Sequence, residues 1–177
     1  MSCDADWHAA CEFRAMQGDA DQTAAKRAIA EELATLLYAE RRRVERLSRI
    51  SSEIAEKERA LLLSCHQKEA ERHVARLERA FAFLGCDPAV RRCAELDAIF
   101  ARGEESCEPL TGEELDEARI TVTKQLQCYR EAAYRRTLAE AVQAGFDKVA
   151  TMLRANLQEE TAAGIELDRY ASADLVG

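Results

Sequence analysis

The sequence predicts an all-α protein in which four long helices form one bundle. Its 177 residues are rich in the helix formers Ala, Glu, Leu and Arg, whereas the strand-preferring residues Val, Ile and Thr are scarce. Only two prolines and seven glycines interrupt the chain, and aromatic residues make up 6% of it. The length suits one domain with a hydrophobic core and is short for two. We therefore expect a single helical domain.

The first pair of long helices is expected before Gly85. An apolar stripe with helical spacing follows an N-terminal arm, residues 1–20, and Ser51 and Ser52 are predicted to break it and to cap the next helix. Gly85 then ends the second helix, and Pro88 just beyond it strengthens this stop signal. The two predicted helices span about 21–50 and 53–84.

The second pair of long helices follows a short connection. A short helix is predicted over 89–102, and the loop after it ends in Thr111-Gly-Glu-Glu114, a capping box for the third long helix. Gly145 is the expected C-terminal stop of that helix. The third and fourth long helices are predicted to end near 144 and 170, so that the bundle spans 21–171 and a tail, 172–177, follows it.

Charge and hydropathy exclude several classes of protein. The chain has 33 acidic and 25 basic residues, a formal net charge of −8, whereas a nucleic-acid-binding protein needs a basic face. No stretch approaches the roughly 18 consecutive apolar residues of a membrane span. The first residues, MSCDADWHAACEF, have no basic segment followed by an apolar run, so we expect no secretory signal and a cytoplasmic location.

The cysteines indicate reduced thiols. They form an odd set of seven without a C-x-x-C pair, at Cys3, Cys11, Cys65, Cys86, Cys93, Cys107 and Cys128. Without an export signal, free thiols are expected instead of a disulfide framework. The spacing of the cysteines does not support a zinc site either.

Acidic and imidazole side chains interrupt the apolar stripes of the predicted helices. In the second helix His66, Glu69 and His73 lie between Leu62 and Leu77, at a spacing that returns to one helix face. Glu40 takes the place of an apolar residue in the first helix, and Glu160 lies between leucines in the fourth. On the third helix, a shared face carries Ile120, Thr123, Gln127, Arg130 and Tyr134. The arginines Arg41, Arg42, Arg43, Arg46 and Arg49 are expected to be solvated surface.

Such positions predict an ionic centre inside the bundle. A buried carboxylate without a partner costs several kcal/mol or takes up a proton, so acids and imidazoles at similar depth need a common partner. Di-iron and di-manganese proteins provide one, because Glu and His from four helices enclose two ions inside their bundles. Carboxylate and imidazole ligands suit iron and manganese. The alternative is that these residues sit at the edge of the stripe and reach water, a groove or a subunit interface.

Several short motifs, in this order and spacing, resemble the YciE/YciF family of bacterial, stress-associated, ferritin-like proteins. The motifs are Leu37-Tyr-Ala-Glu40, His66-x-x-Glu69, Val74-x-Arg-Leu77, Leu84-Gly, Cys93, Tyr129, Ala132-Ala-Tyr134 and Leu157-x-Glu-Glu160. The resemblance covers about residues 30–168. It implies a ferritin-like bundle, a homodimer and a di-metal centre. At the matching positions the implied metal ligands are Glu40, His66, Glu69 and Glu160.

The chain departs from the family pattern on two helices. The family carries a Glu-His-Tyr-Glu run in the third helix, where this chain has Gln127-Cys128-Tyr129-Arg130. An Asp of the fourth helix is replaced by Gly164, and His73 stands where Gln is common. The departures remove the ligands of one wall of the implied site.

Arg130 decides how these departures are interpreted. A guanidinium keeps its positive charge in proteins, so Arg130 inside the site would repel two divalent ions. It could instead replace their charge among Glu40, Glu69 and Glu160 through bidentate hydrogen bonds. We therefore predict a degenerate site that holds at most one ion, iron or manganese, through the four implied ligands. Its expected neighbours are His73, Gln127, Cys128, Arg130 and Tyr134, and zinc, bound by His66 with Cys128, is the weaker alternative.

Two functions remain open at this point. The degenerate site favours a non-enzymatic protein with a structural, stress-related or binding role. An intact centre would instead indicate a di-iron or di-manganese oxidoreductase that reacts with oxygen or peroxide, with tyrosines such as Tyr38, Tyr129 and Tyr134 near the metal. The sequence identifies no substrate and no protein partner.

Overall fold

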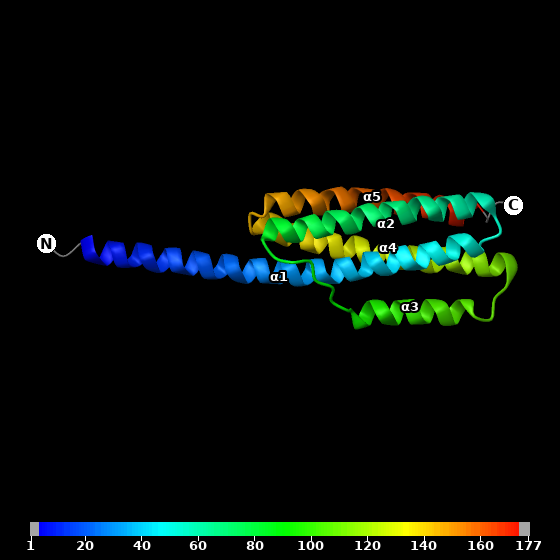
Figure 1. Ribbon diagram of the computed structural model, residues 1–177, viewed down its shortest axis with the longest axis horizontal. Helices are drawn as coiled ribbons and strands as arrows, with labels where there is room; N and C mark the ends of the chain where they lie inside the picture. The colour runs from blue at the N-terminus through cyan, green and yellow to red at the C-terminus, as the bar shows by residue number, and fades with distance from the viewer. Residues whose placement is uncertain (1–3, 174–177) are drawn as a thin grey trace.

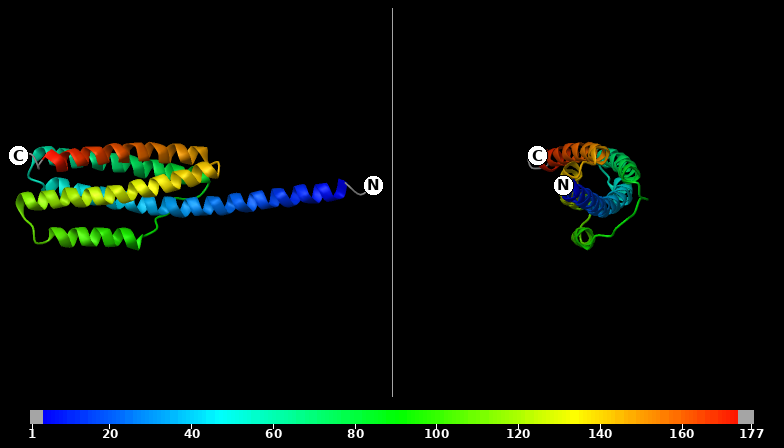
Figure 2. Two further views of the ribbon diagram at one scale, coloured as in Figure 1. Left: turned by 180° about the vertical axis from the view of Figure 1, so that it is seen from behind. Right: turned by 90° about the vertical axis from the view of Figure 1, so that its left-hand side faces the viewer.

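Four antiparallel helices form the bundle, and a fifth, shorter helix lies outside it (Figure 1). The structure is a computed structural model that describes residues 4–173, with side chains for 20–169. The helices are α1 (Asp4–Glu53), α2 (Lys57–Leu84), α3 (Ala94–Cys107), α4 (Gly112–Gln143) and α5 (Asp147–Ala173). Seen end-on, α1, α2, α4 and α5 surround a common interior, while α3 stands apart beside the bundle (Figure 2). The described part of the chain has no strand, and the prediction of an all-α bundle with an extra crossover helix is confirmed.

The inner face of each long helix follows an alternating spacing of three and four residues. This spacing is the one that lets helices pack side by side at a small crossing angle, with side chains of one filling gaps of the next. The buried positions that follow this spacing are 29, 33, 36, 40, 43, 47 and 50 in α1, 63, 66, 70, 73, 77, 80 and 84 in α2, 116, 120, 123, 127, 130, 134, 137 and 141 in α4, and 149, 153, 156, 160, 163 and 167 in α5.

Two of the predicted helix stops are confirmed. Gly85 ends α2 with a left-handed backbone (φ 65°), and its N–H and that of Cys86 bond to carbonyls of the last turn. Gly145 follows α4 with φ 73°. Since a β-carbon makes this conformation unfavourable, glycine is the residue expected at both positions.

The predicted boundaries of the first two helices are wrong in detail. Ser51 and Ser52 lie inside α1, because their hydroxyls donate back to carbonyls of the preceding turn instead of capping a new helix. The N-cap of α2 is Glu56, whose carboxylate accepts from two backbone N–H groups. At the other end, α1 begins at Asp4, so that the expected arm is the N-terminal part of this helix. In Figure 1 this part continues past the other helices.

The crossover helix also differs from the prediction of 89–102. The chain from residue 87 to 93 has no regular secondary structure, and the Arg91 N–H donates to the carbonyl of Ala34 in α1 at 3.1 Å. This connection delays the start of α3 to Ala94. Thr111 is the N-cap of α4 as expected, but its side chain makes no capping hydrogen bond, so the predicted capping box is not formed.

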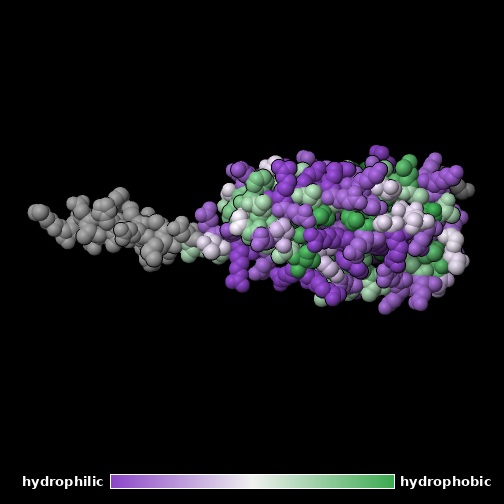
Figure 3. All heavy atoms as spheres, viewed as in Figure 1, coloured by the Kyte–Doolittle hydropathy of each residue, from purple (hydrophilic) through white to green (hydrophobic). Residues whose placement is uncertain are grey.

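The surface of the bundle is mostly polar. Hydrophilic residues dominate the face shown in Figure 3, with apolar residues scattered between them. Among the described residues no helix combines the length and the hydrophobicity that crossing a membrane requires. The described cysteines, which are Cys65, Cys86, Cys93, Cys107 and Cys128, are free thiols.

Candidate functional site

Two fully buried carboxylates, Glu40 of α1 and Glu160 of α5, lie in the interior of the bundle. They separate two apolar clusters of the core. One cluster includes Leu33, Leu37 and Leu153, and the other includes Leu47, Leu63 and Leu167. The helical spacing that places leucines in these clusters therefore places both acids between them.

Two buried arginines face these carboxylates. Arg43 of α1 donates to Oε1 of Glu160 through Nη1, which also lies 3.5 Å from Oε2 of Glu40. Arg130 of α4 places Nε 3.3 Å from Oε2 of Glu160 and 3.9 Å from Oε1 of Glu40. The exposed fractions of the arginines are 3% and 2%. Two negative and two positive charges thus balance in a region without water-exposed side chains.

His73 and Tyr134 complete the surroundings of Glu40. The Tyr134 hydroxyl donates to Oε1 of Glu40 at 2.9 Å, and Nδ1 of His73 lies 3.1 Å from the same oxygen. Nε2 of His73 lies 3.1 Å from Oε2 of Glu159. His73 therefore bridges Glu40 of the buried layer and Glu159 nearer the surface.

The network continues from the buried layer to the surface between α2 and α5. Asn156 donates to the Tyr134 hydroxyl at 3.1 Å and accepts from Nη1 of Arg76 at 3.0 Å. Nη2 of Arg76 donates to Glu159 at 2.7 Å. Arg76 and Glu159 have about a quarter of their side-chain surface exposed. A chain of hydrogen bonds thus joins Glu40 to groups that contact solvent.

The charges around Glu40 change its acidity and that of Tyr134. Burial by itself raises the pKa of Glu40, but the charges of His73 and Arg43 outweigh this effect and lower the pKa to about 2. Burial raises the pKa of Tyr134 well above its usual value, and the negative charge of Glu40 acts in the same direction. At neutral pH Glu40 is therefore ionised and Tyr134 keeps its proton.

The structure separates the four residues predicted as metal ligands into two groups. Glu40 and Glu160 meet at the centre, whereas His66 turns Nε2 toward Glu166 at 3.3 Å. The Glu69 side chain is 26% exposed, and its charged partners are Nη2 of Arg43 and Nη2 of Arg72, each at 4.0 Å. Burial lowers the pKa of His66 to about 4, so that its imidazole is neutral at pH 7. His73, predicted only as a neighbour, takes the central place on α2.

Gln127 and Cys128, two other predicted neighbours of the site, lie in different surroundings. Gln127 donates to the backbone carbonyl of Glu160 and to Glu131, both at 2.9 Å. Its side chain fills the space beside Gly164, where an added β-carbon would come within 2.9 Å of Nε2 of Gln127. Cys128, which was predicted as a neighbour of the site, is exposed and lies outside the buried layer.

The largest correction concerns the arginines of α1. The run was predicted to be solvated, but Arg43 and Arg46 are buried. A cluster of arginines usually indicates a solvent-exposed helix face. The sequence analysis therefore overlooked the helical spacing that places Arg43 on the inner face. Counting from Glu40 by three and then four residues reaches position 43 and then Leu47, so Arg43 continues the inner face. Asn156, a buried residue of the network that the sequence analysis also missed, lies four residues before Glu160 on the inner face of α5.

A di-metal centre does not fit these residues. Three of the four carboxylate oxygens of Glu40 and Glu160 hydrogen-bond to a guanidinium, an imidazole or a hydroxyl group. The fourth, Oε2 of Glu160, makes no hydrogen bond but lies 3.3 Å from Nε of Arg130. Two divalent cations would add four positive charges to a layer that is already balanced. One atom each of Glu40, His73 and Glu160 lies within 4.8 Å of the others, so these three residues could hold a single ion. That ion would have to displace the arginines from the carboxylates.

Comparisons with known proteins identify the same kind of bundle. A family model described as a domain of unknown function, DUF892, matches residues 25–176. No curated protein matches the sequence. The solved structures that resemble the chain include YcfI of Rhodopseudomonas palustris, with 25% identity and a TM-score of 0.76 over 80% of this chain and 90% of that one.

Two more distant structures share the fold. The stress protein YciF of E. coli has 19% identity and a TM-score of 0.78 over 85% of this chain and 96% of its own. A ferritin-like, diiron-carboxylate protein from Bacillus anthracis has 15% identity and a TM-score of 0.64 over 83% of this chain and 97% of its own. The fold is therefore ferritin-like, as the sequence predicted.

Proposed function

Since the chain belongs to the DUF892 family, of the YciE/YciF type that its motifs resemble, we propose that it is a ferritin-like protein with a non-enzymatic structural or binding role. In this proposal an internal ion-pair layer takes the place of a di-metal centre. Two of the similar proteins support such a role, because YciF of E. coli is a stress protein and YcfI of Rhodopseudomonas palustris has been assigned a structural role.

The observation that carries the proposal is the position of Arg43 and Arg130. Both guanidiniums are buried against Glu160, the acid that a ferritin-like site would need as a ligand. A guanidinium does not lose its proton at neutral pH, so it does not make room for a cation as a histidine can. Metal binding at Glu160 therefore requires two fixed positive charges to move away from their partners.

Metal content tests the proposal directly. The chain is purified anaerobically, loaded with Fe²⁺, Mn²⁺ or Zn²⁺, desalted and measured by plasma mass spectrometry. We expect well under one ion per chain. The Arg130→Glu variant removes one central positive charge and adds a carboxylate, so it should retain more metal than the wild type. Arg135→Glu makes the same charge change on the exposed side of α4 and should leave the metal content unchanged.

Two ions of iron or manganese per wild-type chain would refute the proposal. They would favour the second candidate function, a di-metal oxidoreductase that reacts with oxygen or peroxide. The convergence of Glu40, His73 and Glu160 is the observation that favours this candidate. Its test is a peroxide-dependent absorbance in the near ultraviolet after ferrous loading, which the wild type should show and Glu160→Gln should lack.

A homodimer is part of the same proposal. It rests on the resemblance to the YciE/YciF family, and a binding role would then belong to the assembled pair. Light scattering coupled to size-exclusion chromatography measures the mass of the particle in solution, and we expect twice the 19.8 kDa of one chain.

A further inference from the structure

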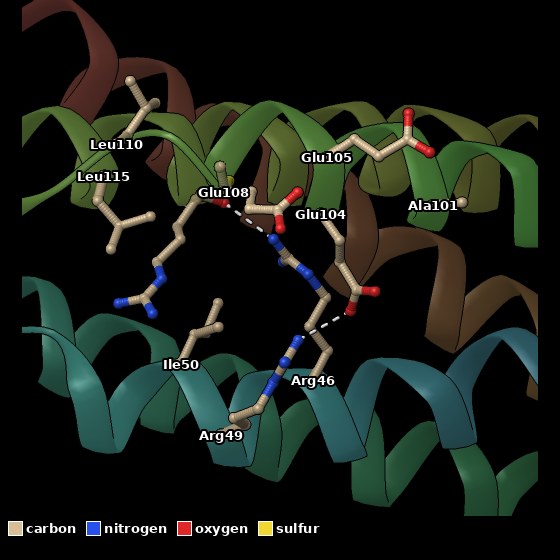
Figure 4. Close-up of a pocket in the computed structure, with 12 residues that line it drawn as sticks. Arg46, Arg49, Ile50, Ala101, Glu104, Glu105, Glu108, Leu110 and Leu115 are labelled. Atoms are coloured by element: carbon tan, nitrogen blue, oxygen red, sulfur yellow. Dashed lines mark hydrogen bonds and ion pairs between the residues drawn. The ribbon is translucent and has the colours of Figure 1, made fainter.

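A second polar region lies on the other side of α1, away from the buried layer. It is a cleft of about 540 Å³ between α1, α3 and the start of α4. Arginines from two helices reach it, namely Arg46 and Arg49 from α1 and Arg119 from α4. Ile50, Leu110 and Leu115 provide an apolar wall (Figure 4). The volume is in the range of pockets that hold small molecules.

Arg46 is the unusual member of this cleft. Its exposed fraction is 8%, and its partners are neutral. Nη1 donates to the Thr123 hydroxyl at 2.7 Å, and Nη2 lies 3.5 Å from the backbone carbonyl of Arg119. In Figure 4 the side chains of Arg46 and Arg49 extend from α1 into the space below α3. A positive charge is thus held at the inner end of the cleft.

The other buried arginines show what Arg46 lacks. Arg43 and Arg130 face Glu160, and Nε of Arg59 lies 3.3 Å from Glu56. Among the residues with described side chains, Arg46 is the one buried arginine without a carboxylate within 4.0 Å. Removing a charge from water costs several kcal/mol unless an opposite charge compensates. Burial lowers the pKa of Arg46 to about 10, and the charge of Arg49 contributes, yet the side chain stays cationic at neutral pH.

No acid of the cleft forms an ion pair with Arg46, although the charge of Glu104 opposes the lowering of its pKa. Glu104 is already paired with Nη2 of Arg49 at 2.9 Å. Glu105 of α3 and Glu108, the C-cap residue just after this helix, are exposed, and Figure 4 shows the carboxylate of Glu105 directed away from the cleft. Exposed carboxylates remain hydrated and are screened by solvent. The buried charge is therefore positive, whereas the negative charges lie at the rim.

We propose that this cleft binds the phosphate group of a small molecule, with Arg46 as the central ligand. Two donors of one guanidinium match two oxygens of a phosphate, which is the geometry that makes arginine common in such sites. Arg49 and Arg119 flank the bound group. The apolar wall leaves room for an organic part, so the ligand is either inorganic phosphate or a phosphate monoester.

Calorimetric titration of the full chain tests the site. Inorganic phosphate and glycerol 3-phosphate are each titrated at constant ionic strength, with chloride as the reference anion. We expect saturable binding of phosphate that chloride does not reproduce. Tighter binding of glycerol 3-phosphate would identify a phosphate monoester as the ligand, and equal binding would identify the inorganic ion. The absence of saturable binding of both below about 10 mM would overturn the proposal.

Three variants locate the bound group. Arg46→Gln should weaken binding at least tenfold. Glu104→Gln releases Arg49 and removes a negative charge from the rim, so it should strengthen binding several-fold. Arg102→Gln removes a positive charge from the exposed face of α3, outside the cleft, and should have no effect.

A second pair of measurements covers the case in which Arg46→Gln does not fold. Arg49 is 55% exposed and Glu104 is 54% exposed, so substitutions at these positions leave the core intact. Arg49→Gln should then weaken binding while Glu104→Gln strengthens it. Unchanged binding in both variants, or in a folded Arg46→Gln, would show that phosphate binds elsewhere.

Discussion

At the scale of single residues, the buried layer shows that charge compensation matters more than the number of charged groups. Arg43 and Arg46 belong to the same run of α1 and are similarly buried, but one faces carboxylates and the other faces neutral oxygens. The sequence could predict Glu40 and Glu160 as interior residues because each replaces a leucine-type position. It could not predict which arginine would enter, since sequence spacing does not show which neighbouring helix provides a partner.

Substitution of these two arginines should therefore have different effects. Arg43→Met leaves a negative charge on Glu160 that Arg130 alone must balance, and we expect a loss of about 3 kcal/mol in the free energy of unfolding. Arg46→Met is the matched control. The Thr123 hydroxyl still donates to the carbonyl of Arg119 at 2.7 Å, so no buried group loses its partner, and the change should stay within about 1 kcal/mol.

Urea unfolding in phosphate-free buffer, followed by circular dichroism, measures both variants. The double variant Arg43→Met with Glu160→Gln should recover at least about 1 kcal/mol of the loss, because the stranded charge is removed as well. If Arg43→Met and Arg46→Met lost equal stability and the double variant recovered none of it, the ion pairs would not be the cause of the loss in the free energy of unfolding.

At the scale of helices, the position of α3 depends on a close approach between its backbone and α4. The sequence predicted the type and order of the helices correctly. Gly85 and Gly145 also predicted the C-terminal ends of α2 and α4 correctly. The start of α3 was missed because it depends on the bond from Arg91 to Ala34, which joins segments far apart in the sequence. Gly103 of α3 lies against Val122 of α4, and a β-carbon at residue 103 would come within 2.5 Å of Cγ1 of Val122.

Gly103→Ala should therefore destabilise the protein although alanine favours helices. At an open helical position this change gains roughly 0.5–1 kcal/mol. Here the clash with Val122 should reverse the sign and cost about 1–3 kcal/mol. Combining it with Val122→Ala should restore stability. Urea unfolding gives the energies, and amide hydrogen exchange in α3 shows whether the helix detaches. A stabilised single variant would contradict the packing described here.

At the scale of the whole molecule, two buried titrating groups make stability depend on pH in the same direction. The pKa of His66 is about 4 in the folded chain and near 6.5 in the unfolded chain, so below pH 6.5 the unfolded state binds an additional proton. The pKa of Glu40 is about 2 in the folded chain and 4.5 in the unfolded chain, so below pH 4.5 the unfolded state also binds an additional proton at this residue. The state that binds more protons gains as the pH falls.

We therefore expect a plateau of stability near pH 7 and a loss in two stages. Burial and the nearby charges of Arg43 and Arg130 keep His66 neutral in the folded chain, although it contacts Glu166 of α5. Between pH 6.5 and 4 this should reduce the free energy of unfolding by on the order of 2 to 3 kcal/mol. Glu40 adds a further loss between pH 4.5 and 2. Urea titrations at pH 7, 5 and 4 measure the first stage. His66→Leu should remove it, and a variant that keeps it would assign the pH dependence to other groups.

The balanced layer also limits how the protein can evolve. A lineage that changes Arg43, Arg130, Glu40 or Glu160 alone passes through a chain with an uncompensated charge in its interior, so these positions should change in pairs of opposite sign. A metal centre with carboxylate ligands and the present ion-pair layer are then two separate solutions for this interior, and a chain between them would fold poorly unless another charge changed first.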